Sequence, residues 1–155
     1  MIRLNEKEEK RFSELAEEII SHPDYQKMKK LIAHGRITVY QHSLDVARFC
    51  FRCNSRMHMG IDERELVTGA LLHDFYLYDW HDASIRVPLF KMHGYTHPST
   101  ACKNASERFD IDARVRYVIK SHMWPLTLRS LPSNKAAWLV CMGDKIVATR
   151  ELFER

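Results

Sequence analysis

Glycine and proline are scarce in this sequence of 155 residues, which contains five of each. All-β sandwiches and linker-rich arrangements consume both residue types in their turns, so the scarcity argues against those classes. Lysine and arginine number 24, but they form no block along the chain, and a net charge of +4 falls short of a nucleic-acid-binding signature. We therefore do not expect a nucleic acid partner, although the mild positive charge favours a small phosphorylated one.

Long apolar runs are also missing. No stretch approaches the roughly 20 apolar residues that a membrane-spanning helix needs. The first residues, Met1 to Glu6, are charged and lack the apolar centre of a signal peptide. The four cysteines fall within apolar helical patterns, and the single CxxC pair has no second pair after it, which is typical of buried, reduced thiols. These features predict a cytoplasmic protein without a membrane partner.

The residues that are present favour helices. Hydrophobic residues make up 45% of the chain and charged residues 28%, as in an ordinary globular domain. Apolar residues recur at helical spacing, and residues that cap or break helices divide them into segments. The predicted helices cover residues 6–20, 24–34, 38–56, 62–78, 98–109, 112–123 and 133 onward. The sequence thus predicts an all-α bundle of six to seven helices in one domain, residues 1–155, with a helical hairpin at 1–35 packed on a core at 36–155.

Five helix ends have recognisable signals. Thr38 and Ser133 are expected N-caps, and Asp62 with Glu65 has the spacing of a capping box. Pro98 is expected at the first position of its helix. Gly35 is expected just past the C-terminus of the helix over 24–34.

The sequence is organised around Leu72-His73-Asp74, where an apolar helical stretch ends in two adjacent polar residues. At helical spacing His73 shares a stripe with Ala70, and Asp74 shares the neighbouring stripe with Leu71. Both polar side chains therefore lie on the face that should be buried, where an unpaired carboxylate is costly. Taken alone, such a pair is more often a hydrogen-bonded core pair than a metal or proton site.

Other polar residues repeat this pattern. His42, His122 and Asp144 each interrupt an apolar stripe on a separate helix, and His97 stands at a helix start. Singly, each is more often a core residue held by a backbone group. Together they are hard to satisfy by hydrogen bonds alone, whereas imidazoles and carboxylates are ligands for Fe, Mn, Co, Ni or Zn. The set predicts a centre of one or two divalent transition-metal ions.

The ordered set of a His, a His-Asp pair and a distal Asp on a helical scaffold resembles the HD-domain superfamily of metal-dependent phosphohydrolases. The motifs that carry the resemblance are Tyr40-Gln41-His42-Ser43, Leu72-His73-Asp74 and Met142-Gly143-Asp144-Lys145. It extends from about Gly35 to the C-terminus. His97 and His122, which lie between the pair and the last Asp, are similar to the branch that holds two metals. The Gly-Tyr-Pro signature of the cyclic-dinucleotide branch is missing, because Gly94-Tyr95 is followed by Thr96.

The resemblance implies a set of residue roles. One metal would be held by His42, His73, Asp74 and Asp144, and a second by Asp74, His97 and His122. The implied reaction is hydrolysis of a phosphate ester or anhydride, of a nucleotide or another small phosphorylated metabolite, by a metal-bound hydroxide.

Beyond the metal ligands, the candidate catalytic residues are Asp74 and two cations for the phosphoryl oxygens, Arg36 and Lys145. These two cations, His81 and Trp124 are also the candidate substrate-binding residues. Each of these four is more often a surface, loop or packing residue.

Two other functions remain open at this point. Some relatives of the superfamily use a di-iron pair on the same ligand set to activate oxygen. A non-catalytic, metal-stabilised nucleotide-binding module is a further alternative. The substrate, the number of metals and homo-oligomer formation are open as well.

Overall fold

The computed structural model describes residues 2–79 and 93–153, which form seven α-helices, one 3₁₀ helix and one two-stranded hairpin. The helices are α1 (Glu6–Ile20), α2 (Pro23–Lys27), α3 (Val39–Arg56), α4 (Glu63–Leu72), α5 (His93–Arg108), α6 (Ala113–Ser121) and α7 (Lys135–Phe153). The 3₁₀ helix η1 covers Met28–Lys30, and the hairpin consists of β1 (Ile32–His34) and β2 (Ile37–Thr38). The predicted all-α fold is confirmed, with the hairpin as a small addition.

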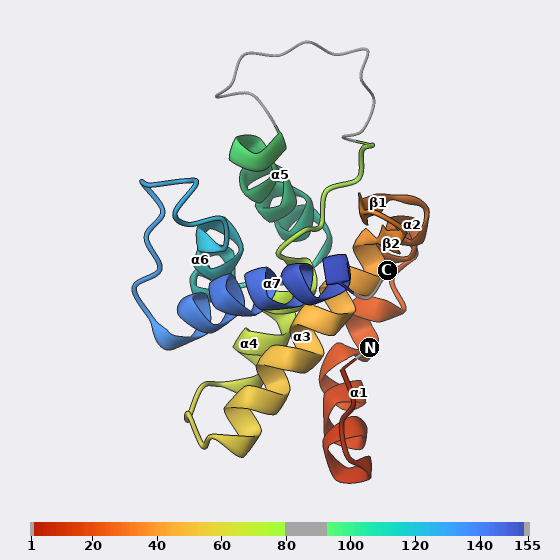
Figure 1. Ribbon diagram of the computed structural model, residues 1–155, viewed down its shortest axis with the longest axis vertical. Coiled ribbons are helices and arrows are strands. Elements are labelled where there is room, and N and C mark those ends of the chain that lie inside the picture. Colours follow the sequence, from red (N-terminus) through yellow and green to blue (C-terminus); the bar gives the residue numbers. More distant parts are fainter. Residues whose placement is uncertain (1, 80–92, 154–155) are drawn as a thin grey trace.

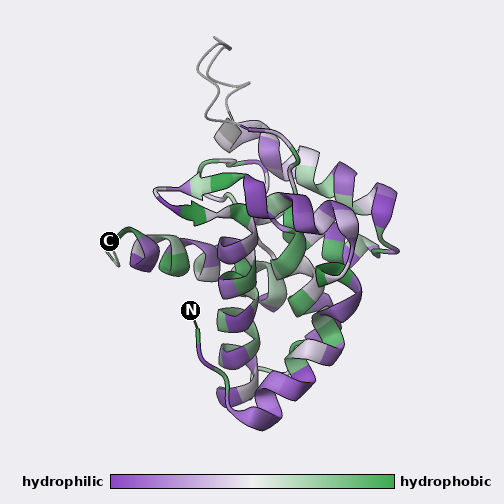
Figure 2. Ribbon diagram, turned by 90° about the vertical axis from the view of Figure 1, so that its right-hand side faces the viewer, coloured by the Kyte–Doolittle hydropathy of each residue, from purple (hydrophilic) through white to green (hydrophobic). Residues whose placement is uncertain are grey.

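The helices surround a core centred on α3 and α4. α1, α6 and α7 all pack against α4, α7 also packs against α3, and α5 packs against α6. Figure 1 shows α7 running across α3 and ending beside the β-hairpin. Hydrophobic residues gather where the helices face one another, and hydrophilic residues cover the outer faces (Figure 2). Val46, Leu71 and Val140 are fully buried there, and burial of such side chains is the main force that holds the helices together. Within the described ranges, no helix has the length and apolar character needed to cross a membrane.

Side-chain caps fix most of the helix starts. Asn5 and Thr38 each form a reciprocal capping box with the residue three positions later, at the starts of α1 and α3. Asp62 and Asp112 accept backbone hydrogen bonds at the starts of α4 and α6. These side chains satisfy N–H groups that have no partner within the first turn. The predicted N-caps at Thr38 and Asp62 are therefore confirmed.

The predicted helix over residues 24–34 is wrong in its second half. The chain leaves helical geometry after η1, and β1 pairs antiparallel with β2. The β-branched residues Ile32, Ile37 and Thr38 favour extended backbone. Gly35 has a φ of 59°, so it adopts the left-handed conformation expected of it, but in the hairpin turn instead of at a helix end.

Three further boundaries differ from prediction. α4 ends at Leu72, six residues before the predicted end, so His73 and Asp74 lie in the turn that follows it. α5 starts at His93, so Pro98 lies inside the helix, where it lacks a backbone N–H to donate. At the start of α7 the capping side chain belongs to Asn134, which accepts from the Ala137 N–H at 2.8 Å. Ser133, the predicted cap, lies one residue too early.

Candidate metal centre

The six side chains that the sequence suggested as ligands meet near the centre of the fold. They come from five helices: His42 of α3, His73 and Asp74 after α4, His97 of α5, His122 after α6 and Asp144 of α7. The four histidines are at most 4% exposed, and the two aspartate side chains are 14% exposed. The group is therefore shielded from water on most sides.

One part of the centre is formed by His42, His73, Asp74 and Asp144. His42 Nε2 lies 3.0 Å from Asp144 Oδ1, and His73 Nε2 lies 3.8 Å from the same oxygen. His73 Nε2 is also 3.6 Å from Asp74 Oδ2. Atoms that share an ion at bond lengths of about 2.0–2.2 Å are separated by distances of this order.

The other part is formed by Asp74, His97 and His122. Asp74 Oδ1 lies 3.1 Å from His97 Nε2 and 3.5 Å from His122 Nε2. The two Nε2 atoms are 2.9 Å apart. Asp74 therefore turns one oxygen toward each part of the centre, which is the arrangement of a bridging carboxylate.

Local backbone groups set the orientation of two of the imidazoles. His73 Nδ1 lies 2.7 Å from the Ala70 carbonyl oxygen, and His122 Nδ1 lies 2.7 Å from the Ile119 carbonyl oxygen. Both carbonyls belong to the last turn of their helix, where they have no intrahelical partner. Because a carbonyl only accepts, each Nδ1 must donate, and the neutral ring then has a lone pair on Nε2. Both lone pairs face the centre, as in histidines that bind metals.

The donor atoms are not satisfied by one another. His73 Nε2 and Asp74 Oδ1 are buried and make no hydrogen bond within the described part of the chain. A buried polar atom without a partner costs about 1–3 kcal/mol. A divalent cation satisfies these lone pairs together, so the residues present fit a metal. The protein has groups of His and Asp side chains that could hold such an ion.

The charges of the two aspartates support the same conclusion. Burial opposes ionisation of Asp144, but a hydrogen bond with His42 and the nearby His73 ring outweigh burial and hold the pKa of that carboxyl well below its usual value. Burial likewise opposes ionisation of Asp74, and the nearby His73 and His97 nevertheless lower its pKa. Both carboxyls are ionised at neutral pH. The centre therefore presents two negative charges to a cation.

A family model for the HD domain matches residues 39–149 of this chain. The chain belongs to the HD-domain superfamily of metal-dependent phosphohydrolases. No curated protein and no solved structure is significantly similar to it. The HD domain extends from α3 into α7 and includes all six ligand candidates, whereas α1, α2 and the hairpin precede it. The resemblance inferred from the sequence is confirmed at the level of the superfamily.

The structure places the candidate substrate-binding residues of the HD domain in different environments. Lys145 Nζ donates to the His122 carbonyl at 2.9 Å and lies 3.8 Å from Asp144 Oδ2, so its charge borders the centre. The ring of Trp124 packs edge-on against Trp138 of α7 at 5.2 Å, which is a packing contact between the end of α6 and α7.

The other two candidates are Arg36 and His81. Arg36 is exposed in the turn between β1 and β2, and within the described residues no hydrogen bond or ion pair joins it to the ligands. His81 lies outside the described residues.

An open pocket of about 390 Å³ adjoins the HD-domain centre. It is lined by Met123, Pro125, Leu126, Asp144 and Lys145. The sequence pointed only to Asp144 and Lys145 among these five residues. The pocket volume lies within the range of roughly 300–1,000 Å³ for small-molecule sites.

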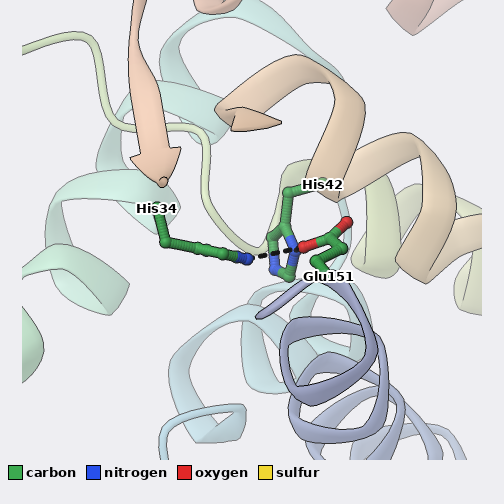
Figure 3. Close-up of side chains that lie close together, drawn as sticks. All are labelled: His34, His42 and Glu151. Carbon is green, nitrogen blue, oxygen red and sulfur yellow. Dashed lines mark hydrogen bonds and ion pairs between the residues drawn. The ribbon is translucent and has the colours of Figure 1, made fainter. Parts of the chain in front are cut away.

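Glu151 and His34 also belong to this region, although the sequence analysis did not single them out. Glu151 Oε2 lies 2.9 Å from His42 Nδ1 and 2.7 Å from His34 Nε2 (Figure 3). Glu151 follows Asp144 by seven residues, so both lie on one face of α7. The rule that identified Asp144, a carboxylate on an apolar stripe, could have identified Glu151 one repeat later. His34 offered no such signal, because it lies in the segment that was predicted as helix.

Proposed function

We propose that the protein is a metal-dependent phosphohydrolase that cleaves a phosphate ester or anhydride of a small metabolite such as a nucleotide. Membership of the HD-domain superfamily supports a metal-dependent hydrolase. The observation that carries the proposal is the pair of donor groups that share Asp74, one with His42 and His73 and one with His97 and His122. When bound there, divalent metals supply a hydroxide at neutral pH and Lewis-acid sites for phosphoryl oxygens.

Each residue of the centre has a distinct role in this proposal. His42, His73, Asp74 and Asp144 hold one ion, while Asp74, His97 and His122 hold the other. The backbone carbonyls at the ends of α4 and α6 keep two of the imidazoles aimed inward without a further side chain. This prior orientation lowers the cost of arranging ligands when a metal binds.

Lys145 contributes charge at the edge of the site. Its ammonium donates to the carbonyls of His122 and Cys141 at 2.9 and 3.2 Å, so it is held beside Asp144. A fixed cation at the pocket wall stabilises the negative charge that spreads over phosphoryl oxygens in the transition state. Arg36 is exposed in the turn of the hairpin, where its charge can attract an anionic substrate.

The pocket indicates the kind of substrate. Met123, Pro125 and Leu126 make one wall apolar, and Asp144 and Lys145 make the other ionic. This combination suits a small molecule with a phosphate at one end and an apolar or planar group at the other. Nucleoside monophosphates meet this description better than sugar phosphates do.

A phosphate-release screen tests the proposal. The purified protein is incubated with Mn²⁺ or Co²⁺ and with nucleoside monophosphates, dinucleoside polyphosphates and sugar phosphates. We expect release from at least one nucleotide class by the wild type and by Asp110→Ala, an exposed aspartate, but not by Asp74→Ala. Iron in the purified protein with oxygen uptake and no phosphate release would indicate the oxidative chemistry instead. Tight nucleotide binding without turnover would indicate a binding module.

A further inference from the structure

A chain of three side chains extends outward from the metal centre on the far side of His42. His34 comes from the end of β1, His42 from the first turns of α3, and Glu151 from the last turn of α7. Figure 3 shows the three side chains together, with one Glu151 oxygen beside the His42 ring and joined by a dashed line to His34. Glu151 Oε2 lies 2.9 Å from His42 Nδ1 and 2.7 Å from His34 Nε2.

Glu151 and Asp144 reach opposite nitrogens of the same imidazole. Asp144 Oδ1 lies 3.0 Å from His42 Nε2, on the side of the proposed metal, and Glu151 lies on the Nδ1 side. Because an ionised carboxylate only accepts, His42 Nδ1 must donate to Glu151. A neutral His42 ring that keeps its proton on Nδ1 has its Nε2 lone pair facing the centre, as metal ligation requires.

His42 needs a side chain for this purpose, whereas His73 and His122 do not. Those two histidines directly follow a helix and donate to last-turn carbonyls. His42 lies near the start of α3, and the carbonyl three residues before it, at Val39, accepts a hydrogen bond within that helix. The carbonyl in this position is therefore not free for the His42 ring, and Glu151 accepts the hydrogen bond instead.

Glu151 is itself held in place. Its side chain is only 5% exposed, and within the described residues its ion-pair partners are the two histidines, with no lysine or arginine among them. His34, 24% exposed, contacts Glu151 from the hairpin. The hairpin precedes residues 39–149, the stretch that matches the family model. The contact therefore links the N-terminal segment of this chain to the centre.

We infer that Glu151 is a positioning residue that fixes the tautomer and ring orientation of His42 for metal binding, and that His34 holds Glu151 in this position. The inference rests on the proposed metal-dependent function. Removal of such an outer carboxylate weakens metal binding by about 10–100-fold in characterised metal sites. We expect a loss of this size here, with a smaller loss when only His34 is removed.

The test is a cobalt titration of the metal-free full-length protein, with the visible spectrum of bound Co²⁺ as a second readout. Glu151→Ala removes the acceptor and should weaken Co²⁺ binding by about 10–100-fold and change the spectrum. Glu151→Gln keeps an acceptor oxygen of the same reach and should restore most of the affinity. Leu152→Ala, an exposed neighbour in the same turn of α7, is the control and should bind as the wild type does.

The outcomes separate this inference from the proposed function. Wild-type affinity and spectrum in Glu151→Ala would overturn the positioning role while leaving the metal site intact. A third equivalent of Co²⁺ in the wild type that disappears in His34→Ala would also overturn it, because His34 and Glu151 would then be ligands. A wild-type protein that binds no cobalt overturns the proposed function as well. If Glu151→Ala does not fold, wild-type affinity and spectrum in His34→Ala overturn the inference, because a smaller loss of Co²⁺ binding is expected of that variant.

Discussion

The contact between α4 and α6 at Gly69 sets the spacing of two metal-ligand candidates. A Cβ atom added to Gly69 would lie 2.7 Å from Val118 Cγ1 and 3.1 Å from Val118 Cβ. Carbon atoms in ordinary contact are about 3.5–4.0 Å apart, so Gly69→Ala must move the helices or Val118 by roughly 1 Å. Gly69 precedes His73 by four residues and Val118 precedes His122 by four, and the two rings lie 4.9 Å apart. If α4 and α6 move apart at Gly69, the two imidazoles, which lie one turn later on these helices, move apart as well.

Two opposing effects decide the size of the change in stability. Alanine is favoured over glycine inside a helix by about 1 kcal/mol. Overpacking a tight core typically costs about 1–3 kcal/mol. Val118 is fully buried, so its side chain has no solvent to move into. We expect the overpacking to prevail and Gly69→Ala to lower the free energy of unfolding by about 1 kcal/mol.

Urea unfolding of the metal-free protein measures this change, and a cobalt titration of the same variant measures its effect on the centre. Gly69→Ala should weaken cobalt binding as well as stability. The double variant Gly69→Ala/Val118→Ala removes the clash, so we expect a coupling energy of about 0.5–3 kcal/mol between the two sites. A Gly69→Ala protein that is about 1 kcal/mol more stable and binds cobalt normally would refute the reasoning, because helix propensity alone would then account for it.

Three further changes test other parts of the structure. A hydrogen bond from Arg56 outweighs burial and lowers the pKa of Glu8 from 4.5 to about 2, so Glu8 adds stability above pH 4.5 that is lost as the pH falls toward 2. In urea unfolding, the free energy of unfolding of the wild type should exceed that of Glu8→Gln by an amount that shrinks across that range. A difference that stays constant with pH would contradict this prediction. Lys145→Met removes the donor to the His122 carbonyl and should lower phosphate release. It should also lower the free energy of unfolding by about 1 kcal/mol. Lys120→Met, at an exposed lysine of α6, is the control and should change neither quantity. His97→Ala should leave about one metal per chain by elemental analysis, and retention of two would exclude His97 as a ligand.

The starts of α1, α3 and α4 could be predicted, unlike those of α5 and α7, because their capping depends on residues only three positions apart. Asn5, Thr38 and Asp62 each accept a hydrogen bond from the N–H group three residues on. The end of α4 could not be predicted in the same way. The apolar pattern continues through Leu77, but the chain leaves the helix after Leu72, which places the polar pair in a turn. The end of α4 depends on tertiary contacts, and the spacing of apolar residues carries no information about them.

The candidate ligands could be suggested from sequence because each is a polar side chain on an otherwise apolar stripe. The same criterion applies to Glu151, which continues the Asp144 face of α7 and is 8% exposed. His34 could not be found, since its position depends on a hairpin that replaces part of a predicted helix. The pocket wall at Met123 and Leu126 is formed by the chain beyond α6, and helical periodicity says nothing about that segment.

Metal content is the most direct test of the account, because Asp74 turns one oxygen toward each group of donors. Elemental analysis of the purified wild type, Asp74→Ala and the exposed control Asp110→Ala compares them under the same conditions. We predict one or two divalent transition-metal ions per chain in the wild type and in the control, and a loss of bound metal in Asp74→Ala. An Asp74→Ala protein that keeps the full wild-type complement would contradict the account.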